Sequence, residues 1–142
     1  MILKSIRLTT LLFILIAIGC DDNTTNSNIP NVAVNIYISL QDPEFIDLTV
    51  PSGSVNVTGG SRGIVVYRVN EDEFKAYDRH CTYAPSSSCG IVEMENSGVS
   101  LRDNCCGSVF SIFSGYPSQG PAMVPLKEYR TSFDGNTLRI YN

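Results

Sequence analysis

Several residue types and patterns are missing from this chain of 142 residues, and each absence excludes a class of protein. Tryptophan is absent and histidine occurs once, as His80, so one chain cannot supply two imidazoles to a site. With 10 basic and 14 acidic residues, the chain has no basic excess with which to bind nucleic acid. No amphipathic helix of ten residues, phosphate-binding glycine loop or Ser-His-Asp spacing stands out. We therefore do not expect the chain to be an enzyme by itself.

The N-terminal residues combine a basic start with a short apolar run, residues 11–19. The run is shorter than the roughly 20 residues that cross a bilayer, and it has the length of a secretory signal's apolar region. It ends in AIGC at residues 17–20, which resembles the bacterial lipobox, where cleavage precedes a cysteine that receives lipid. The pattern predicts a cell-envelope protein held to the membrane by lipid on Cys20. An ordinary signal peptide and an N-terminal membrane anchor are the alternatives.

The chain divides into three segments on this interpretation. Residues 1–19 form a signal peptide, and residues 20–31 contain the lipidated cysteine and a polar linker, DDNTTNSNIPN. Residues 32–142 are long enough for one domain and contain no internal repeat.

The domain consists of short apolar segments separated by turn signals. Residues 32–40 alternate apolar and other side chains, and residues 64–69 are rich in β-branched residues. A hairpin is expected where residues 128–133 and 137–141 flank Asp-Gly-Asn. Shorter strands are expected among residues 45–50, 55–57, 74–77, 91–94, 99–101 and 109–113, with loops at 78–90, 102–108 and 115–125. This pattern predicts an all-β antiparallel sandwich or small barrel.

Four cysteines remain in the domain: Cys81, Cys89, Cys105 and Cys106. Outside the cytosol such cysteines form disulfides unless a metal holds them. Adjacent Cα atoms lie about 3.8 Å apart, too close for the ~4.4–6.8 Å that disulfides prefer. Two pairings remain open: Cys81–Cys106 with Cys89–Cys105, or Cys81–Cys105 with Cys89–Cys106.

Three motifs follow one another in the domain: AYDRHCTY, DNCCGSVF and SGYPSQGPAMVPLKEY. Their order resembles the Rieske iron–sulfur domain, whose first loop carries Cys-x-His and whose second carries Cys-x-x-His-Gly-Ser-x-Phe. A proline loop with Gly-Pro-Ala covers the cluster in that family. Residues 107–110 match Gly-Ser-x-Phe, and residues 120–122 match Gly-Pro-Ala. The resemblance covers residues 32–142 and implies a Rieske-like fold with two cluster-type loops and a proline loop.

The resemblance also assigns positions to the cluster ligands, which in Rieske centres are two cysteines on one iron and two histidines on the other. The equivalent positions here are Cys81, Tyr83, Asp103 and Cys106, and only Cys81 is of the expected type. His80 lies on the wrong side of Cys81 and is interpreted as a loop or strand-end histidine.

Other positions in the motifs carry roles implied by the same family. Ser108 stands where the family's serine donates a hydrogen bond to the cluster, and Pro121 belongs to the loop that covers it. Cys105 occupies the position that bonds to a first-loop cysteine in disulfide-bearing members, and Cys89 is its candidate partner.

Three hypotheses follow for the function. The first, which we favour, is a domain without a cofactor, stapled by Cys89–Cys105 and Cys81–Cys106 and acting in binding or interaction. The second is an electron-transfer protein with a 2Fe–2S cluster held by the altered ligand set. The third is a thiol-redox or single-metal site, although the spacing suits neither a zinc ribbon nor a Cys-x-x-Cys motif. We expect the membrane as one partner, with an unidentified envelope or redox protein as another, and no nucleic acid.

Overall fold

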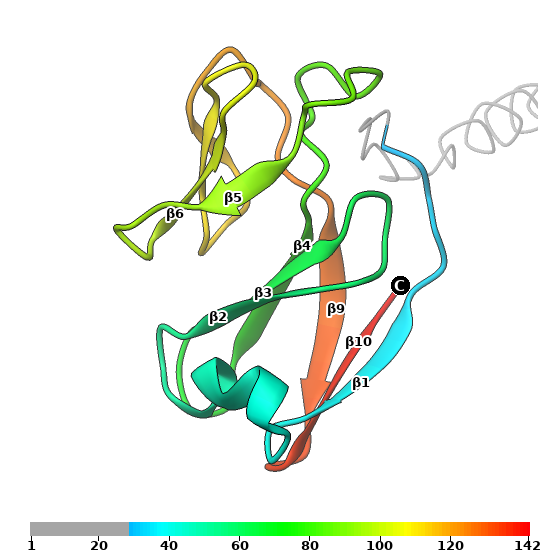
Figure 1. Cartoon of the computed structure of the whole chain (residues 1–142), viewed down its shortest axis with the longest axis vertical. Helices are drawn as coiled ribbons and strands as arrows, with labels where there is room; N and C mark the ends of the chain where they lie inside the picture. Colours follow the sequence, from blue (N-terminus) through cyan, green and yellow to red (C-terminus); the bar gives the residue numbers. More distant parts are fainter. Residues whose placement is uncertain (1–28) are drawn as a thin grey trace, which may run out of the picture.

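The computed structural model describes residues 29–142, which form ten strands and one short 3-10 helix (Figure 1). In chain order these are β1 (Asn35–Ser39), η1 (Pro43–Thr49), β2 (Ser54–Val57), β3 (Ile64–Arg68), β4 (Phe74–Asp78), β5 (Val92–Met94), β6 (Ser100–Asp103), β7 (Val109–Ser111), β8 (Pro117–Gln119), β9 (Glu128–Phe133) and β10 (Thr137–Tyr141). Within residues 29–142, no helix has the length and hydropathy needed to span a bilayer. The predicted signal peptide and lipidated Cys20 lie outside the described residues.

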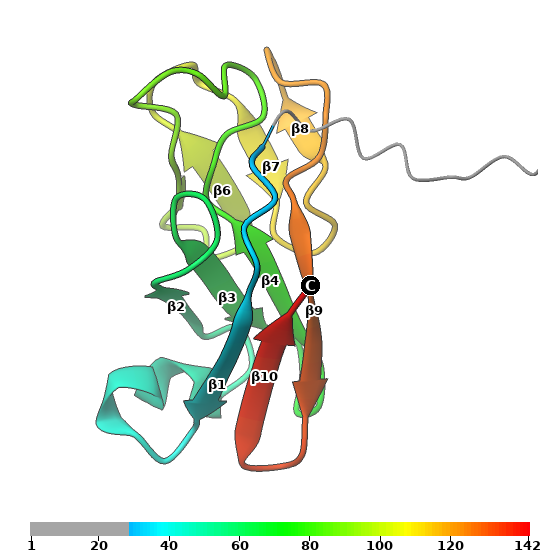
Figure 2. The same ribbon diagram turned by 90° about the vertical axis from the view of Figure 1, so that its right-hand side faces the viewer.

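The strands form two antiparallel sheets. The larger has the order β1-β10-β9-β4-β3-β2, and the smaller has the order β5-β6-β7-β8. Strand β4 pairs directly with β9, with Ala76 opposite Tyr129, so the whole small sheet is inserted between two neighbouring strands of the large one. Figure 2 shows the small sheet above one end of the large sheet. The all-β antiparallel fold predicted from the sequence is therefore confirmed.

Strand β3 is buried on both faces, which explains the continuous apolar run of residues 64–67. Because side chains alternate along a strand, Ile64 and Val66 enter one core, where Leu48 and Leu138 also lie. Val65 and Tyr67 face the other way, into a second core that the small sheet completes. Strand β3 thus joins the two halves of the domain.

Two segments differ from the sequence prediction. Residues 45–50 were expected to be a strand, but residues 43–49 form the 3-10 helix η1, which starts at Pro43 with an acidic residue in its first turn. Proline favours the first turn of a helix, and only Leu48 of this segment is fully buried while Ile46 is 60% exposed. The expected loop at 115–125 contains the short strand β8, which extends the small sheet beside β7.

Candidate functional site

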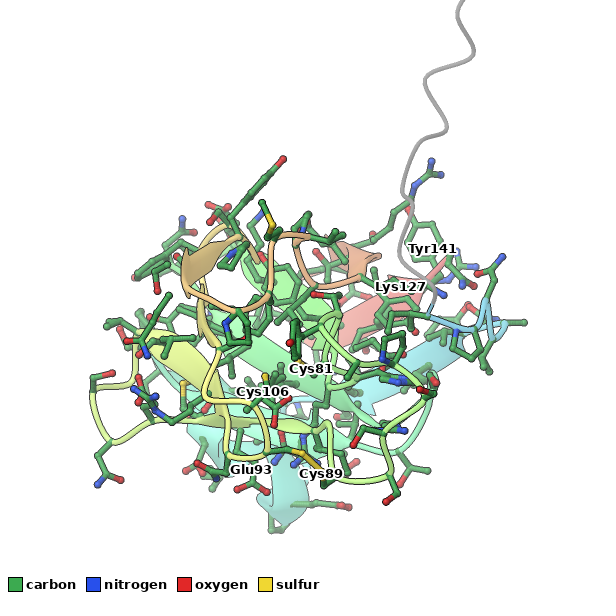
Figure 3. All side chains as sticks on the ribbon, turned by 90° about the horizontal axis from the view of Figure 1, so that it is seen from above. Cys81, Cys89, Glu93, Cys106, Lys127 and Tyr141 are labelled. Carbon is green, nitrogen blue, oxygen red and sulfur yellow. A yellow bond between two sulfur atoms is a disulfide. The ribbon has the colours of Figure 1, made fainter. Side chains whose placement is uncertain are left out.

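Three loops meet at the end of the molecule that carries the small sheet (Figure 1). The first loop, residues 79–91, leaves β4, and the second, residues 104–108, connects β6 to β7. The third, residues 120–127, contains a cis Gly120–Pro121 bond and returns the chain to β9. Figure 3 looks onto this end and shows Cys81 of the first loop close to Cys106 of the second.

A disulfide between Cys89 and Cys105 joins the first loop to the second. Their Cα atoms lie 5.7 Å apart, within the range that disulfides prefer. The sequence left two partners open for Cys89, and in the structure it bonds to Cys105 and not to Cys106. The bridge closes a span of 16 residues between β4 and β7.

Cys81 and Cys106 are free thiols that face each other, with a distance of 3.8 Å between their Sγ atoms. The second bridge expected in the stapled hypothesis is therefore not formed in this structure. Asp103 completes the group, because its Oδ2 lies 3.2 Å from the Cys106 Sγ. Ligand atoms of all three residues lie within 4.8 Å of one another, and Cys81 and Asp103 are each 1% exposed.

The Asp103 carboxylate is held by its own loop. Its Oδ1 accepts the backbone N–H of Cys105 at 2.7 Å, and its Oδ2 accepts the thiol of Cys106. Burial raises the pKa of Asp103, but hydrogen bonds from Cys81, Cys105 and Cys106 outweigh it and leave the pKa below its usual value. Burial and the hydrogen bond to Asp103 raise the pKa of the Cys81 thiol, so that thiol is protonated at neutral pH.

Ser108 lies where the Rieske resemblance places it, beside Cys106. It is fully buried, and its Oγ lies 3.0 Å from the Cys106 Sγ and accepts the backbone N–H of Ala122 at 2.9 Å. The Cys106 thiol has a single proton, which it can donate either to Asp103 or to Ser108. When that proton goes to Asp103, the Ser108 hydroxyl can donate its own proton to the Cys106 sulfur. Pro121 itself is exposed, and the contact from the third loop comes from Ala122.

The other two candidates for ligands lie differently. Tyr83 has a side chain that is 53% exposed. His80 is 4% exposed, its Nε2 donates to the carbonyl oxygen of Pro85 at 2.7 Å, and the hydroxyl of Ser61 donates to its Nδ1 at 2.8 Å. Both ring nitrogens are therefore used, and His80 is a structural residue that fixes the first loop.

The residues of this site do not match the ligand set of a Rieske cluster. Such a cluster takes two cysteines and two histidines. Here two thiols and one carboxylate converge, and both nitrogens of the only imidazole in the chain are already hydrogen-bonded.

The sequence did not predict the hydrogen bonds of Asp78 and Arg62 that hold the first loop in place. Asp78, fully buried at the end of β4, accepts hydrogen bonds from the backbone N–H groups of Ser61, Arg62 and His80 and from the hydroxyl of Tyr129. The Arg62 side chain donates to carbonyl oxygens of the same loop, including Gly90 at 2.9 Å. The Gly-Gly-Ser-Arg-Gly segment appears in the sequence only as a turn, and nothing in it signals these partners.

The fold is Rieske-like. It has two antiparallel sheets, one loop after β4, a second loop in the small sheet, and a proline loop beside them. Solved structures agree with this assignment. The plasma membrane Rieske protein PetC3 of Synechocystis PCC 6803 matches with a TM-score of 0.58 and 20% identity, over 75% of this chain and 99% of that protein. The ferredoxin of carbazole 1,9a-dioxygenase from Nocardioides aromaticivorans IC177 matches with a TM-score of 0.52 and 16% identity, over 77% of this chain and 96% of that one.

A chain from the complex of reduced oxygenase and oxidized ferredoxin in carbazole 1,9a-dioxygenase gives a TM-score of 0.53 at 20% identity, over 76% of this chain and 93% of that chain. No protein-family model and no curated protein matches the sequence. At these identities the likeness shows the fold. The Rieske-like fold expected from the three motifs is thereby confirmed.

Proposed function

We propose that this chain is a cell-envelope lipoprotein whose Rieske-like domain works without an iron–sulfur cluster, as a binding or interaction module. In this proposal the Cys89–Cys105 disulfide holds the first loop to the second, which a cluster bound by both loops would otherwise do. Loop closure over this span contributes roughly 3 kcal/mol in the chain-entropy account.

One observation carries the proposal: the only histidine of the chain is committed elsewhere. His80 donates to Pro85 and accepts from Ser61, and it would have to give up both contacts to bind metal. The positions equivalent to the two histidine ligands hold Tyr83 and Cys106. A half-exposed phenol and a thiol are poor substitutes for two imidazoles on one iron.

The exposed side chains of the loops support a role in binding. Met123 on the third loop is 91% exposed and Tyr83 on the first loop is 53% exposed. Methionine and tyrosine are enriched at protein interfaces, where an apolar body adapts to a partner surface. We therefore place the interaction surface at the loop end, with an envelope or redox protein as the partner.

Electron transfer through a cluster with altered ligands is the second candidate, and one observation favours it. Cys81, Asp103 and Cys106 converge on one point from the two loops that carry cluster ligands in Rieske proteins. An iron-bound form would need oxygen ligands in place of imidazoles.

Iron content separates the two candidates. The full chain is expressed with its own N-terminal segment in a bacterium, purified in detergent, and assayed for iron and for visible absorption. We expect no stoichiometric iron. About two irons per chain with visible absorption, the composition of a 2Fe–2S cluster, would refute the cluster-free proposal and establish the electron carrier.

Lipid attachment is tested separately. We expect metabolic labelling with a radioactive fatty acid to mark the chain, and the Cys20→Ser variant to lose the label and the membrane fraction. Labelling that persists in Cys20→Ser would show that this cysteine is not the anchor.

A further inference from the structure

The group formed by Cys81, Asp103 and Cys106 is not used by the disulfide and has the chemistry of a metal site. Two thiols from the first and second loops and a carboxylate from the end of β6 place their ligand atoms within 4.8 Å of one another. Thiolate ligands favour zinc and similar soft or borderline ions, and carboxylates also bind zinc.

The distance between the sulfurs fits one tetrahedral ion. A Zn–S bond of about 2.3 Å and a tetrahedral angle at the metal place two sulfurs about 3.8 Å apart. The Sγ atoms of Cys81 and Cys106 lie 3.8 Å apart. Both side chains could therefore bind the same ion with little movement.

The charge of Asp103 gives a second, independent argument for a cation. The carboxylate is 1% exposed, and a buried charge is stabilised by hydrogen bonds, by an opposite charge or by a metal. Asp78 has three backbone N–H donors and a hydroxyl, whereas Asp103 has one backbone N–H and a thiol. The ion pairs among residues 29–142 join Lys75 to Glu128, Arg79 to Glu93, and Arg102 to Glu95, so Asp103 has no basic partner there. Its neighbour Arg102 is committed to Glu95.

We propose that Cys81, Asp103 and Cys106 bind one divalent zinc-like ion through two thiolates and one carboxylate. On binding, the ion displaces one proton from each thiol, and both protons pass to solvent. The oxidation states of the sulfurs and of the metal do not change. Three protein ligands leave the fourth position of the tetrahedron open to water or to an external ligand.

Ser108 lies next to Cys106 and can stabilise the metal-bound form of that cysteine. Its oxygen already accepts the N–H of Ala122, so the free hydroxyl proton can be donated to the sulfur of Cys106 when that sulfur becomes a thiolate. A hydrogen bond of this kind orients the ligand and stabilises its negative charge. The third loop would thus stabilise the metal-bound form.

The proposal deepens the cluster-free function and rests on it, because an iron–sulfur cluster would occupy the same residues. A disulfide between Cys81 and Cys106 is the competing state, and it would consume both sulfur ligands. The experiment must therefore report iron, free thiols and metal binding on the same preparation.

The test uses the full chain purified anaerobically in detergent, stripped with a chelator and titrated with Co²⁺ as a spectroscopic substitute for Zn²⁺. We expect one Co²⁺ per chain, with intense visible bands of tetrahedral coordination and thiolate-to-metal charge-transfer bands in the near ultraviolet. One equivalent of Zn²⁺ should remove these bands. Two thiols per denatured, unreduced chain should be titratable before metal is added and protected from alkylation afterwards in the folded protein.

Variants assign the ligands. Cys81→Ser and Cys106→Ser should abolish the charge-transfer bands, and Asp103→Asn should weaken binding by at least about tenfold. Asp103→Cys should instead strengthen binding and intensify charge transfer, because it adds a third thiolate. Glu93→Gln, which changes an exposed carboxylate on β5, is the matched control and should leave the affinity unchanged.

The outcomes are separable. Absence of iron together with absence of saturable Co²⁺ binding, in a folded chain with two titratable thiols, overturns the metal site and leaves the cluster-free function standing. No free thiols after anaerobic purification would also overturn it, in favour of a Cys81–Cys106 bridge. About two irons per chain would overturn the proposed function itself.

Discussion

Two buried aspartates occupy matching places in the two sheets. Asp78 ends β4 and Asp103 ends β6, and each precedes a cysteine-bearing loop. In each case Oδ1 accepts the backbone N–H two residues further on, from His80 at 2.9 Å and from Cys105 at 2.7 Å. This local turn is a common use of aspartate, and here it starts both loops.

The second oxygen distinguishes the two. Oδ2 of Asp78 accepts the N–H of Ser61 at 2.6 Å and the hydroxyl of Tyr129 at 2.8 Å, donors fixed in other parts of the fold. The side-chain partners of Asp103 are the thiols of Cys81 and Cys106, which can lose their protons. The same residue therefore closes a polar network in one sheet and leaves a ligand available in the other.

Substitution of Asp78 should have the largest effect on stability. Asp78→Ala would leave three backbone N–H groups and one hydroxyl without their acceptor, and we expect a loss of about 4 kcal/mol in the free energy of unfolding. Asp103→Ala should cost less, about 1–2 kcal/mol without metal, because it removes one backbone acceptor and a weaker thiol contact. Urea denaturation of both variants, with chelator present, measures the difference, and equal losses would remove the distinction between the two aspartates.

The two cysteine pairs should differ in the same direction. Replacing Cys89 and Cys105 together by alanine removes a cross-link over 16 residues and should cost about 3 kcal/mol. Replacing Cys81 and Cys106 together by alanine should cost about 1–2 kcal/mol, because packing and weak thiol hydrogen bonds are lost but no cross-link is. A larger loss for the second pair would indicate that it is bonded in the oxidised protein.

The same substitution at two tyrosines measures how much the hydrogen bonds of Asp78 contribute to the free energy of unfolding. Tyr129→Phe removes the hydroxyl that binds Asp78 and should destabilise the domain by about 1–2 kcal/mol. Tyr77→Phe removes a buried hydroxyl that has no partner among the described residues, so stability should stay equal or rise slightly. Thermal unfolding of both variants provides the comparison, and a loss at Tyr77 similar to that at Tyr129 would contradict it.

The smallest expected effect is a loss of stability at alkaline pH, which depends on the hydroxyls of Tyr77 and Tyr129. Burial, with the hydrogen bond to Asp78, raises the pKa of Tyr129, and burial with Glu128 and Glu73 raises that of Tyr77. Because the folded protein holds these protons more tightly, their stabilising contribution is complete below the ordinary tyrosine pKa of about 10 and is lost progressively above it. Unfolding measured from pH 8 to 12 should show this decline, and Tyr129→Phe should reduce it.

The sequence predicted those parts of the fold that depend on local pattern. The β-branched run of β3 and the Asp-Gly-Asn hairpin of β9 and β10 lie as expected, because alternation and turn chemistry are local. The prediction for residues 45–50 was wrong because the apolar residues there resemble a strand, while Pro43 and the single buried position, Leu48, favour a short 3-10 helix. A count of apolar residues does not distinguish these cases.

The site was predictable only in part, for a related reason. The motifs located Cys81, Cys106 and Ser108, which the fold brings together from two loops. They could not show that His80 is bound by Ser61, 19 residues earlier, or that Asp103 has no basic partner within residues 29–142. Those facts depend on contacts between segments that are distant in sequence and carry no pattern of their own.

The direction from which the chain reaches β1 limits how the domain can be presented. Lys127, at the end of the third loop, donates to the carbonyl oxygen of Pro30 and to Asn31, so the polypeptide arrives beside the loop end (Figures 1 and 2). Eight residues, 21–28, separate Cys20 from Ile29, and a fully extended chain of this length spans at most about 30 Å. In a chain lipidated at Cys20, the loops would therefore stay near the bilayer, and a partner would have to reach them along the membrane surface.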